Sequence, residues 1–274
     1  MERGNLRVLM QPAELVIIAG AGVSTLLTAN PLHILKDLFV SFGGIIKGSR
    51  FKRDYYLATL KMMYDLFNKA RKEGPVSIEA DIEQPQSSAI FSRNKMFTSD
   101  HHAVAFVCDT MRMTITGGVE AFDVDQMMEL DMEVHHHSIA KPVMALSTVA
   151  DALPGLGIVA AVLGVVITMG ALGGPPEEIG HKVAAALVGT FLGILLCYGV
   201  VGPISTNMSQ TTDEEKAYYH VLRVLMLAFM KGTAPVLAVE MGRRATPGHV
   251  RPSFQELEAL CRNESGGAAA AGAS

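Results

Sequence analysis

Two long apolar runs dominate the second half of the chain. They extend from Leu153 to Leu172 and from Val183 to Thr206, which makes them 20 and 24 residues long, and neither contains Asp, Glu, Lys, Arg or His. An α-helix of about 20 residues crosses the roughly 30 Å of hydrocarbon in a bilayer. Because only the short polar link from Gly173 to Lys182 separates the runs, the pattern predicts a membrane hairpin.

Both runs are rich in small residues. The first contains Gly157 and Gly164 among others, and the second contains a G-x-x-x-G spacing, Gly189 to Gly193. A leucine side chain gains little by leaving lipid for a neighbouring helix, so helix association in a membrane depends on close backbone approach at small residues. The two helices are therefore expected to pack tightly against other helices.

A third apolar run extends from Leu15 to Leu32, over 18 residues without a charged side chain. Its length is marginal for a span, and we interpret it as a third transmembrane helix, with a buried helix of a soluble domain as the alternative. An ion path normally needs an ionisable group inside the membrane. Since none of the three runs contains one, a partner chain would have to supply that carboxylate.

Positive charge predicts the orientation. Thirteen Lys and Arg residues lie between Pro31 and Pro142, seven follow Met208, and only Lys182 lies in the hairpin link. Because cytoplasmic loops carry the excess of basic residues, the middle and C-terminal segments are expected in the cytoplasm and the link outside. Three spans then place the N-terminus outside although it carries Arg3 and Arg7, which suggests that an upstream helix is missing.

The remaining segments show helical rather than strand periodicity, so the expected fold is an all-α polytopic membrane protein with about three transmembrane helices and a helical cytoplasmic domain. Its expected parts are an extracytoplasmic stub (1–14), transmembrane helices (15–32, 151–174 and 183–208), a cytoplasmic helical domain (33–150), a periplasmic loop (175–182), cytoplasmic C-terminal helices (209–263) and a disordered tail (264–274).

Composition narrows the chemistry. The chain is 49% hydrophobic with a formal net charge of −4, which gives no general affinity for nucleic acid. Three widely separated cysteines fit neither a disulfide framework nor a zinc site. Successive residues of a helix point about 100° apart, so His135, His136 and His137 cannot converge on one metal ion; we expect them, like His101 and His102, on the solvated surface. No metal and no cofactor is expected.

Two prolines and two charged residues have ordinary local interpretations. Pro154 fits the first turn of a helix, and Pro203 fits a helix end. Arg71 and Glu79 belong to a basic and then acidic stretch and read as surface charges. An exposed ion pair is worth about 0 to 1 kcal/mol, which suits a contact that is made and released repeatedly.

Several separated motifs resemble one family. They are LPGLGIVAAVLGVV (153–166), VGTFLGILLCYGVVGPI (188–204), QPAEL (11–15), VEMGRR (239–244) and RPSFQELE (251–258). They closely resemble, in order, the MotA flagellar motor stator subunits of the MotA/TolQ/ExbB proton channel superfamily, and the resemblance extends over essentially the whole chain. The family has four transmembrane helices, and Met1 aligns just before the second.

The resemblance implies a proton-driven stator in the bacterial inner membrane. A homo-oligomeric ring of MotA-like subunits would surround MotB-type partners, whose membrane Asp carries the ion, and cytoplasmic charges would push on the rotor protein FliG. One charge crossing the membrane yields about 2.3 kcal/mol per 100 mV, enough to break several exposed ion pairs. The missing carboxylate in the apolar runs fits this arrangement.

The resemblance also assigns residues to an ion path. Pro154 and Pro203 match the family's two functional prolines, Thr190 matches the hydroxyl residue facing the path, and Tyr198 lies farther along the same helix. Ala161 occupies a position where sodium-driven relatives have Thr. Since a methyl group offers Na⁺ no oxygen ligand, H⁺ is the expected ion.

The resemblance assigns two further residues to the rotor contact. Arg71, in NKARKEG, matches the rotor-facing basic residue, and Glu79, in SIEADIEQP, matches the rotor-facing acidic one.

Two other functions stay open. An ExbB or TolQ-type energiser of outer-membrane transport fits the three spans by count but leaves the RPSFQELE segment without a role. A non-conducting membrane scaffold is the second. An enzyme is not expected, because no nucleophile with a base, phosphate loop or carboxylate pair lies in a credible setting.

Overall fold

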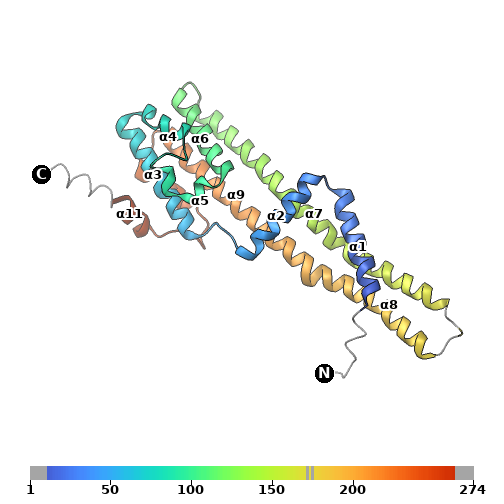
Figure 1. The fold of residues 1–274 in the computed structure, drawn as a ribbon. Helices are drawn as coiled ribbons and strands as arrows, with labels where there is room; N and C mark the ends of the chain where they lie inside the picture. The colour runs from blue at the N-terminus through green and yellow to red at the C-terminus, as the bar shows by residue number, and fades with distance from the viewer. Residues whose placement is uncertain (1–10, 171–172, 174–175, 263–274) are drawn as a thin grey trace. The chain divides into compact units, whose positions relative to one another are not determined.

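A computed structural model describes residues 11–170, 173 and 176–262, and this part of the chain is helical with no β-strand (Figure 1). The predicted all-α class is therefore confirmed. The α-helices are α1 (Pro12–Ala29), α2 (Leu32–Lys47), α3 (Arg53–Glu73), α4 (Glu79–Glu83), α5 (Lys95–Thr98), α6 (His101–Thr116), α7 (Ala121–Met169), α8 (Pro176–Leu196), α9 (Gly202–Met230), α10 (Pro235–Ala245) and α11 (Phe254–Arg262).

The chain forms two compact units, 1–48 with 138–211 and 49–137 with 212–274. We call the first the membrane unit and the second the polar unit. Helices α7 and α9 each contribute residues to both units. The expected stub up to residue 10 and the expected tail from residue 264 lie outside the described residues.

The membrane unit is built on long apolar helices. Helix α1 and the helices Ala121–Met169 and Lys182–Met230 are long and apolar enough to cross a membrane, with mean hydropathies of 1.5, 2.3 and 2.2 over their most apolar windows. Their outer faces expose large apolar side chains such as Val16, Val166 and Leu187. Such side chains are unfavourable in water and suited to lipid, so the three predicted spans correspond to three helices of the structure.

Glycines set the distance between α7 and α8. A Cβ added to Gly157 would lie 2.8 Å from the Gly189 carbonyl oxygen and 3.0 Å from the Gly193 Cα. A Cβ on Gly193 would lie 2.6 Å from the Leu153 carbonyl oxygen. The obstructing atoms belong to backbone, which cannot turn aside as a side chain can, so only glycine permits this contact. The predicted tight packing of the G-x-x-x-G helix is confirmed.

The two prolines do not begin or end helices. Pro154 lies inside the 49-residue helix α7, and Pro203 lies inside a helical stretch that continues from α8 to Met230. A five-residue π-helical turn, Cys197–Val201, precedes Pro203. The local interpretation as a first-turn proline and a helix stop is therefore wrong, because packing between long helices holds the chain helical across both positions.

The polar unit has an aromatic and aliphatic core. Tyr55 of α3 stacks on Tyr218 of α9 with ring centroids 4.7 Å apart, and Phe67 stacks on Phe229 at 4.7 Å. The buried Tyr218 hydroxyl lies 3.0 Å from Thr59 Oγ1. Burial of such large rings, with the polar tip hydrogen-bonded, fixes α3 against the C-terminal half of α9.

Histidines also take part in this unit. The rings of His102 and His135 stack with centroids 3.6 Å apart, and His135 Nε2 lies 2.9 Å from Glu215 Oε1. Burial and the neighbouring His135 lower the pKa of His102 below its usual value. The expectation of a solvated surface is wrong for these two residues, because α6, α7 and α9 bring together side chains that are distant in the sequence.

The glycine contact generates a prediction. Replacing Gly193 with Ala should force α7 and α8 apart and lower the thermal stability of the detergent-solubilised chain, since overpacking costs about 1–3 kcal/mol. Gly180→Ala, on the same helix α8 with nothing within 4 Å of its Cβ position, is the matched control and should leave the melting midpoint in place. Equal midpoints for the two variants would contradict the contact.

Candidate functional site

The tight contact of α7 and α8 brings two predicted ion-path residues together. A Cβ on Gly189 would lie 3.3 Å from the Ala161 nitrogen and 3.3 Å from the Ala160 Cβ. Thr190 follows Gly189 directly, so Thr190 and Ala161 stand at the same level of the helix pair, and both are half-buried. The structure thus places at one level two residues that are 29 positions apart in the sequence.

The Thr190 hydroxyl is available for another group. Threonines inside helices usually donate to the carbonyl four residues earlier, as Thr168 does to Gly164 at 2.7 Å and Thr206 does to Gly202 at 3.0 Å. Within the described part of the chain, Thr190 makes no hydrogen bond through its side chain. A half-buried hydroxyl without an internal partner can bind water or a neighbouring polar group.

Tyr198 and Pro203 lie together in another part of the membrane unit. Tyr198 belongs to the π-helical turn and is 74% exposed, and with Pro203, Thr206 and Gln210 it lines an open hollow on the helix surface. Thr190 precedes Tyr198 by eight residues, about 12 Å along an α-helix. The predicted path residues of this stretch therefore follow one another along α8 and into α9.

Pro154 stands on α7 close to the glycine contact. Its neighbour Leu153 is buried and presents its carbonyl oxygen to Gly193, whereas Pro154 itself is half-buried. Because proline has no N–H, the helix lacks one backbone hydrogen bond at this position. Ser205 Oγ donates to the Val143 carbonyl at 3.2 Å, which ties α9 to α7 on the other side of both prolines.

Glu14 is a membrane-unit residue that the sequence analysis missed. It lies in the first turn of α1, it is only 8% exposed, and its Oε2 has no hydrogen-bond partner in the described part of the chain. A Cβ on Gly189 would lie 2.9 Å from this oxygen, and one on Gly164 would lie 3.5 Å from Oε1.

The expectation that the spans hold no ionisable group is therefore wrong. The uncharged run begins at Leu15, but helix α1 begins at Pro12, a residue typical of a helix N-terminus, and therefore includes Glu14.

The predicted rotor-contact residues lie in the polar unit and are exposed. Arg71 is in the last turn of α3, and Glu79 begins α4. Neither forms an ion pair within the described residues, although charged neighbours do: Lys69 Nζ lies 2.7 Å from Asp81 Oδ2, and Ser88 Oγ donates to Asp81 Oδ1 at 2.6 Å. The buried Asp81 thus holds the segment in place, while Arg71 and Glu79 stay open to a partner.

The two C-terminal motifs form a small structural site. Arg243 and Arg244 both form ion pairs with Glu240, at 2.7 and 2.8 Å. The hydrogen bond from Arg243, together with that from Arg244, lowers the pKa of the Glu240 carboxyl group to about 2. Arg251 donates to the carbonyls of Thr246 and Arg244. These bonds fix the turn between α10 and α11.

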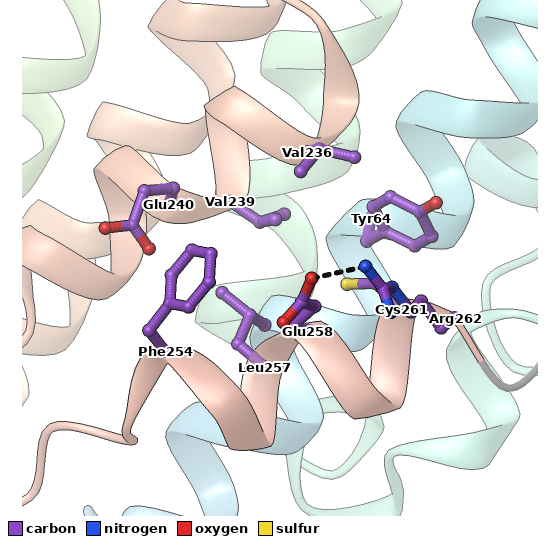
Figure 2. Close-up of a pocket in the computed structure, with 9 residues that line it drawn as sticks. All are labelled: Tyr64, Val236, Val239, Glu240, Phe254, Leu257, Glu258, Cys261 and Arg262. Atoms are coloured by element: carbon purple, nitrogen blue, oxygen red, sulfur yellow. Dashed lines mark ion pairs between the residues drawn. The ribbon is translucent and has the colours of Figure 1, made fainter.

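A cavity of about 350 Å³ lies where α11 faces α10 and α3 (Figure 2). Phe254, Leu257 and Cys261 of α11 point toward Val239 and Tyr64, and Glu258 pairs with Arg262 at 2.8 Å along the rim. The apolar lining and the internal ion pairs suit docking of α11 on the polar unit. No group of three His, Cys, Asp or Glu residues is placed to bind a metal in the part of the chain that the structure describes.

Comparisons with known proteins agree with this organisation. The sequence matches the motility protein A N-terminal family over residues 1–74 and the MotA/TolQ/ExbB proton channel family over residues 98–220. It is 38% identical to motility protein A of Escherichia coli, over 94% of this chain and 88% of that protein. It is 33% identical to chemotaxis protein LafT of Vibrio parahaemolyticus, over 96% and 92%.

Solved structures show the same fold. The structure of the flagellar MotAB stator complex from Bacillus subtilis matches with a TM-score of 0.69 at 21% identity, over 87% of this chain and 86% of that one. The C. jejuni MotAB structure matches with a TM-score of 0.74 at 16% identity, over 92% and 91%. The matches favour the first of the three functions that the sequence left open, and the chain belongs to the motility protein A family of flagellar stator subunits.

Proposed function

We propose that this chain, in a homo-oligomeric ring around MotB-type partners, forms a proton channel in the bacterial inner membrane and turns proton flow into torque on the rotor protein FliG. The observation that carries the proposal is the 38% identity to motility protein A over 94% of the chain. The polar unit lies in the cytoplasm in this arrangement, as the basic residues indicate. The role is transport and mechanical work, with no enzymatic step.

The proposed ion path follows α7 and α8. Ala161 and Thr190 lie at one level of the tight contact, and the Thr190 hydroxyl has no internal hydrogen bond among the described residues. A hydroxyl can pass a proton by giving one and accepting another, whereas Na⁺ needs several oxygen ligands that the Ala161 methyl does not offer. Tyr198 extends the polar positions along the helix. The membrane Asp of the partner supplies the main proton carrier.

The proposed coupling device consists of Pro154 and Pro203. Each removes one helical hydrogen bond inside a helix that contributes residues to both units, and the π-helical turn before Pro203 is a second irregularity. Bending at these points costs less than bending a regular helix. A change in charge on the partner can therefore move the helices without unfolding them.

The proposed rotor contact is made by Arg71 and Glu79. Both are exposed, and both lack an ion pair within the described chain. One proton crossing a 100 mV potential releases about 2.3 kcal/mol, and an exposed ion pair is worth about 0 to 1 kcal/mol. Each crossing therefore supplies enough free energy to release one or more such pairs.

The function is tested in a non-motile strain that lacks its own stator genes. Expression of this chain with its MotB-type partner should restore swimming. A protonophore should stop the swimming, and removal of external sodium should leave it unchanged, because Ala161 offers Na⁺ no ligand. Swimming that depends on sodium would contradict the proton assignment, and the absence of swimming despite membrane assembly of both chains would contradict the stator function.

The prolines are tested by alanine, which restores the missing N–H and favours a helix interior by about 3 kcal/mol. Pro154→Ala and Pro203→Ala should each abolish or severely reduce swimming while the amount of assembled complex stays normal. Pro142, inside the same helix α7, provides the matched control, and Pro142→Ala should swim. Full motility of both test variants would remove the coupling role.

The rotor contact is tested by charge reversal. Arg71→Glu and Glu79→Lys should each slow swimming in part, since a single exposed pair contributes only about 0 to 1 kcal/mol. An opposite reversal on the charged face of FliG should restore part of the speed. Lys95→Glu, at another exposed position of the polar unit, is the control. If no reversal on FliG compensates either variant, direct contact is ruled out.

A further inference from the structure

Glu14 is an acidic side chain enclosed by apolar helices. It is 8% exposed, and three helices meet around it, because α1 packs on α8 and the Gly189 position next to Glu14 also touches Ala160 of α7. A carboxyl group without a hydrogen-bonding partner is costly to bury. Its place in the membrane unit therefore calls for a reason other than packing.

The space around Glu14 is made by small residues. Gly164 and Gly189 face its two carboxyl oxygens, and Ala186 lies against Gly164, where an added Cβ would come within 2.9 Å of the Ala186 Cβ. None of these residues is charged or offers a side-chain donor. A side chain at Gly189 would reach the position of Oε2, since an added Cβ already lies 2.9 Å from it, so these glycines leave room for the carboxyl group.

Polar residues stand on the link side of Glu14 among apolar ones, and the other side is apolar. One turn closer to the link stand Gln11, which precedes α1, Thr168 on α7 and Lys182 on α8. Gln11 and Lys182 each interact with another group, and the Thr168 hydroxyl donates to the Gly164 carbonyl. One turn farther from the link, Ile18 is fully buried with Ala160, Leu153 and Cys197. Glu14 thus stands between the level closer to the link, which holds three polar side chains, and an apolar core.

This depth suits exchange with water. Gly164 precedes the end of α7 at Met169 by five residues, about 8 Å along the helix axis. The carboxyl group therefore lies between helices but near the link. It also lies next to Gly189, the residue that directly precedes Thr190. A role as a helix cap is not supported, because no backbone N–H of the described residues donates to Oε2.

We propose that Glu14 is a proton-relay carboxyl of this chain, placed between the link side and the level of Ala161 and Thr190. A hydronium ion on the link side gives its proton to the Glu14 carboxylate, which leaves water and a neutral carboxylic acid. The proton then passes through water to the partner's membrane carboxylate, and Glu14 returns to its anionic form. This relay rests on the proposed function, a proton channel that the chain forms with its MotB-type partner.

Proton influx into cells that express the complete complex tests the relay, measured with a pH-sensitive fluorescent protein and divided by the amount of assembled complex. Glu14→Gln keeps the size of the side chain and removes the exchangeable acid, so influx should fall about tenfold or more. Glu14→Asp should retain a measurable part of the influx. Glu120→Gln, at an exposed acid of the polar unit, is the matched control and should conduct normally.

Equal influx through the Glu14→Gln complex overturns the relay, whereas no influx through the unmodified complex contradicts the proposed function instead. A second measurement reads Glu14 directly. Infrared difference spectra of the unmodified complex should contain the C=O band of a carboxylic acid that titrates with pH and that Glu14→Asp shifts. If Glu14→Gln fails to assemble, this band decides, and the lack of any band shifted by Glu14→Asp overturns the proposal.

Discussion

Backbone contact between α7 and α8 is the constraint on which the membrane unit depends. At Gly157, Gly189 and Gly193 an added Cβ would come within 3 Å of backbone or of Glu14, so the distance between the helices is set by the absence of side chains. That distance places Ala161 beside the Gly189–Thr190 step and leaves room for the Glu14 carboxyl group. In lipid, where apolar side chains gain little by meeting one another, such contacts are the main source of helix association. The Glu14 carboxyl group and the Thr190 hydroxyl can therefore lie beside the glycine contact, because the contact itself does not require large apolar side chains there.

In the polar unit, some charged side chains are paired within the chain and others are exposed. Lys69 and Asp81 pair with each other, and Ser88 satisfies the second oxygen of Asp81. Arg71 and Glu79, two residues away from that pair, remain exposed. Asp81 is buried whereas the Lys69 side chain is 33% exposed, so removing a partner of Asp81 would leave a buried charge without its full set of bonds. The same short stretch therefore combines a hydrogen-bonded ion pair with two exposed charges, to which we assign the proposed rotor contact.

The sequence predicted what depends on contiguous residues. The two apolar runs, the polar link and the G-x-x-x-G spacing contain enough information for the all-α class, the hairpin helices and their tight packing. The sequence did not predict Glu14, whose burial depends on Gly164 and Gly189 in other helices and which stands one residue before the apolar run. Likewise, His102 and His135 come together only through the packing of α6 on α7. Tertiary contacts of this kind leave no local pattern in the chain.

The rule that proline begins or ends a helix does not hold at Pro154 and Pro203. Spacing alone favours a helix start at Pro154 and a helix end at Pro203. Both helical stretches nevertheless continue, Ala121–Met169 across Pro154 and Lys182–Met230 across Pro203, because packing along their length offsets the loss of one hydrogen bond. A helix that ended at either proline could not transmit a displacement along its axis. A fully regular helix would resist bending. The coupling that we propose calls for both properties, which a continuous helix with one missing hydrogen bond combines, and the π-helical turn before Pro203 is a second irregularity of the same helical stretch.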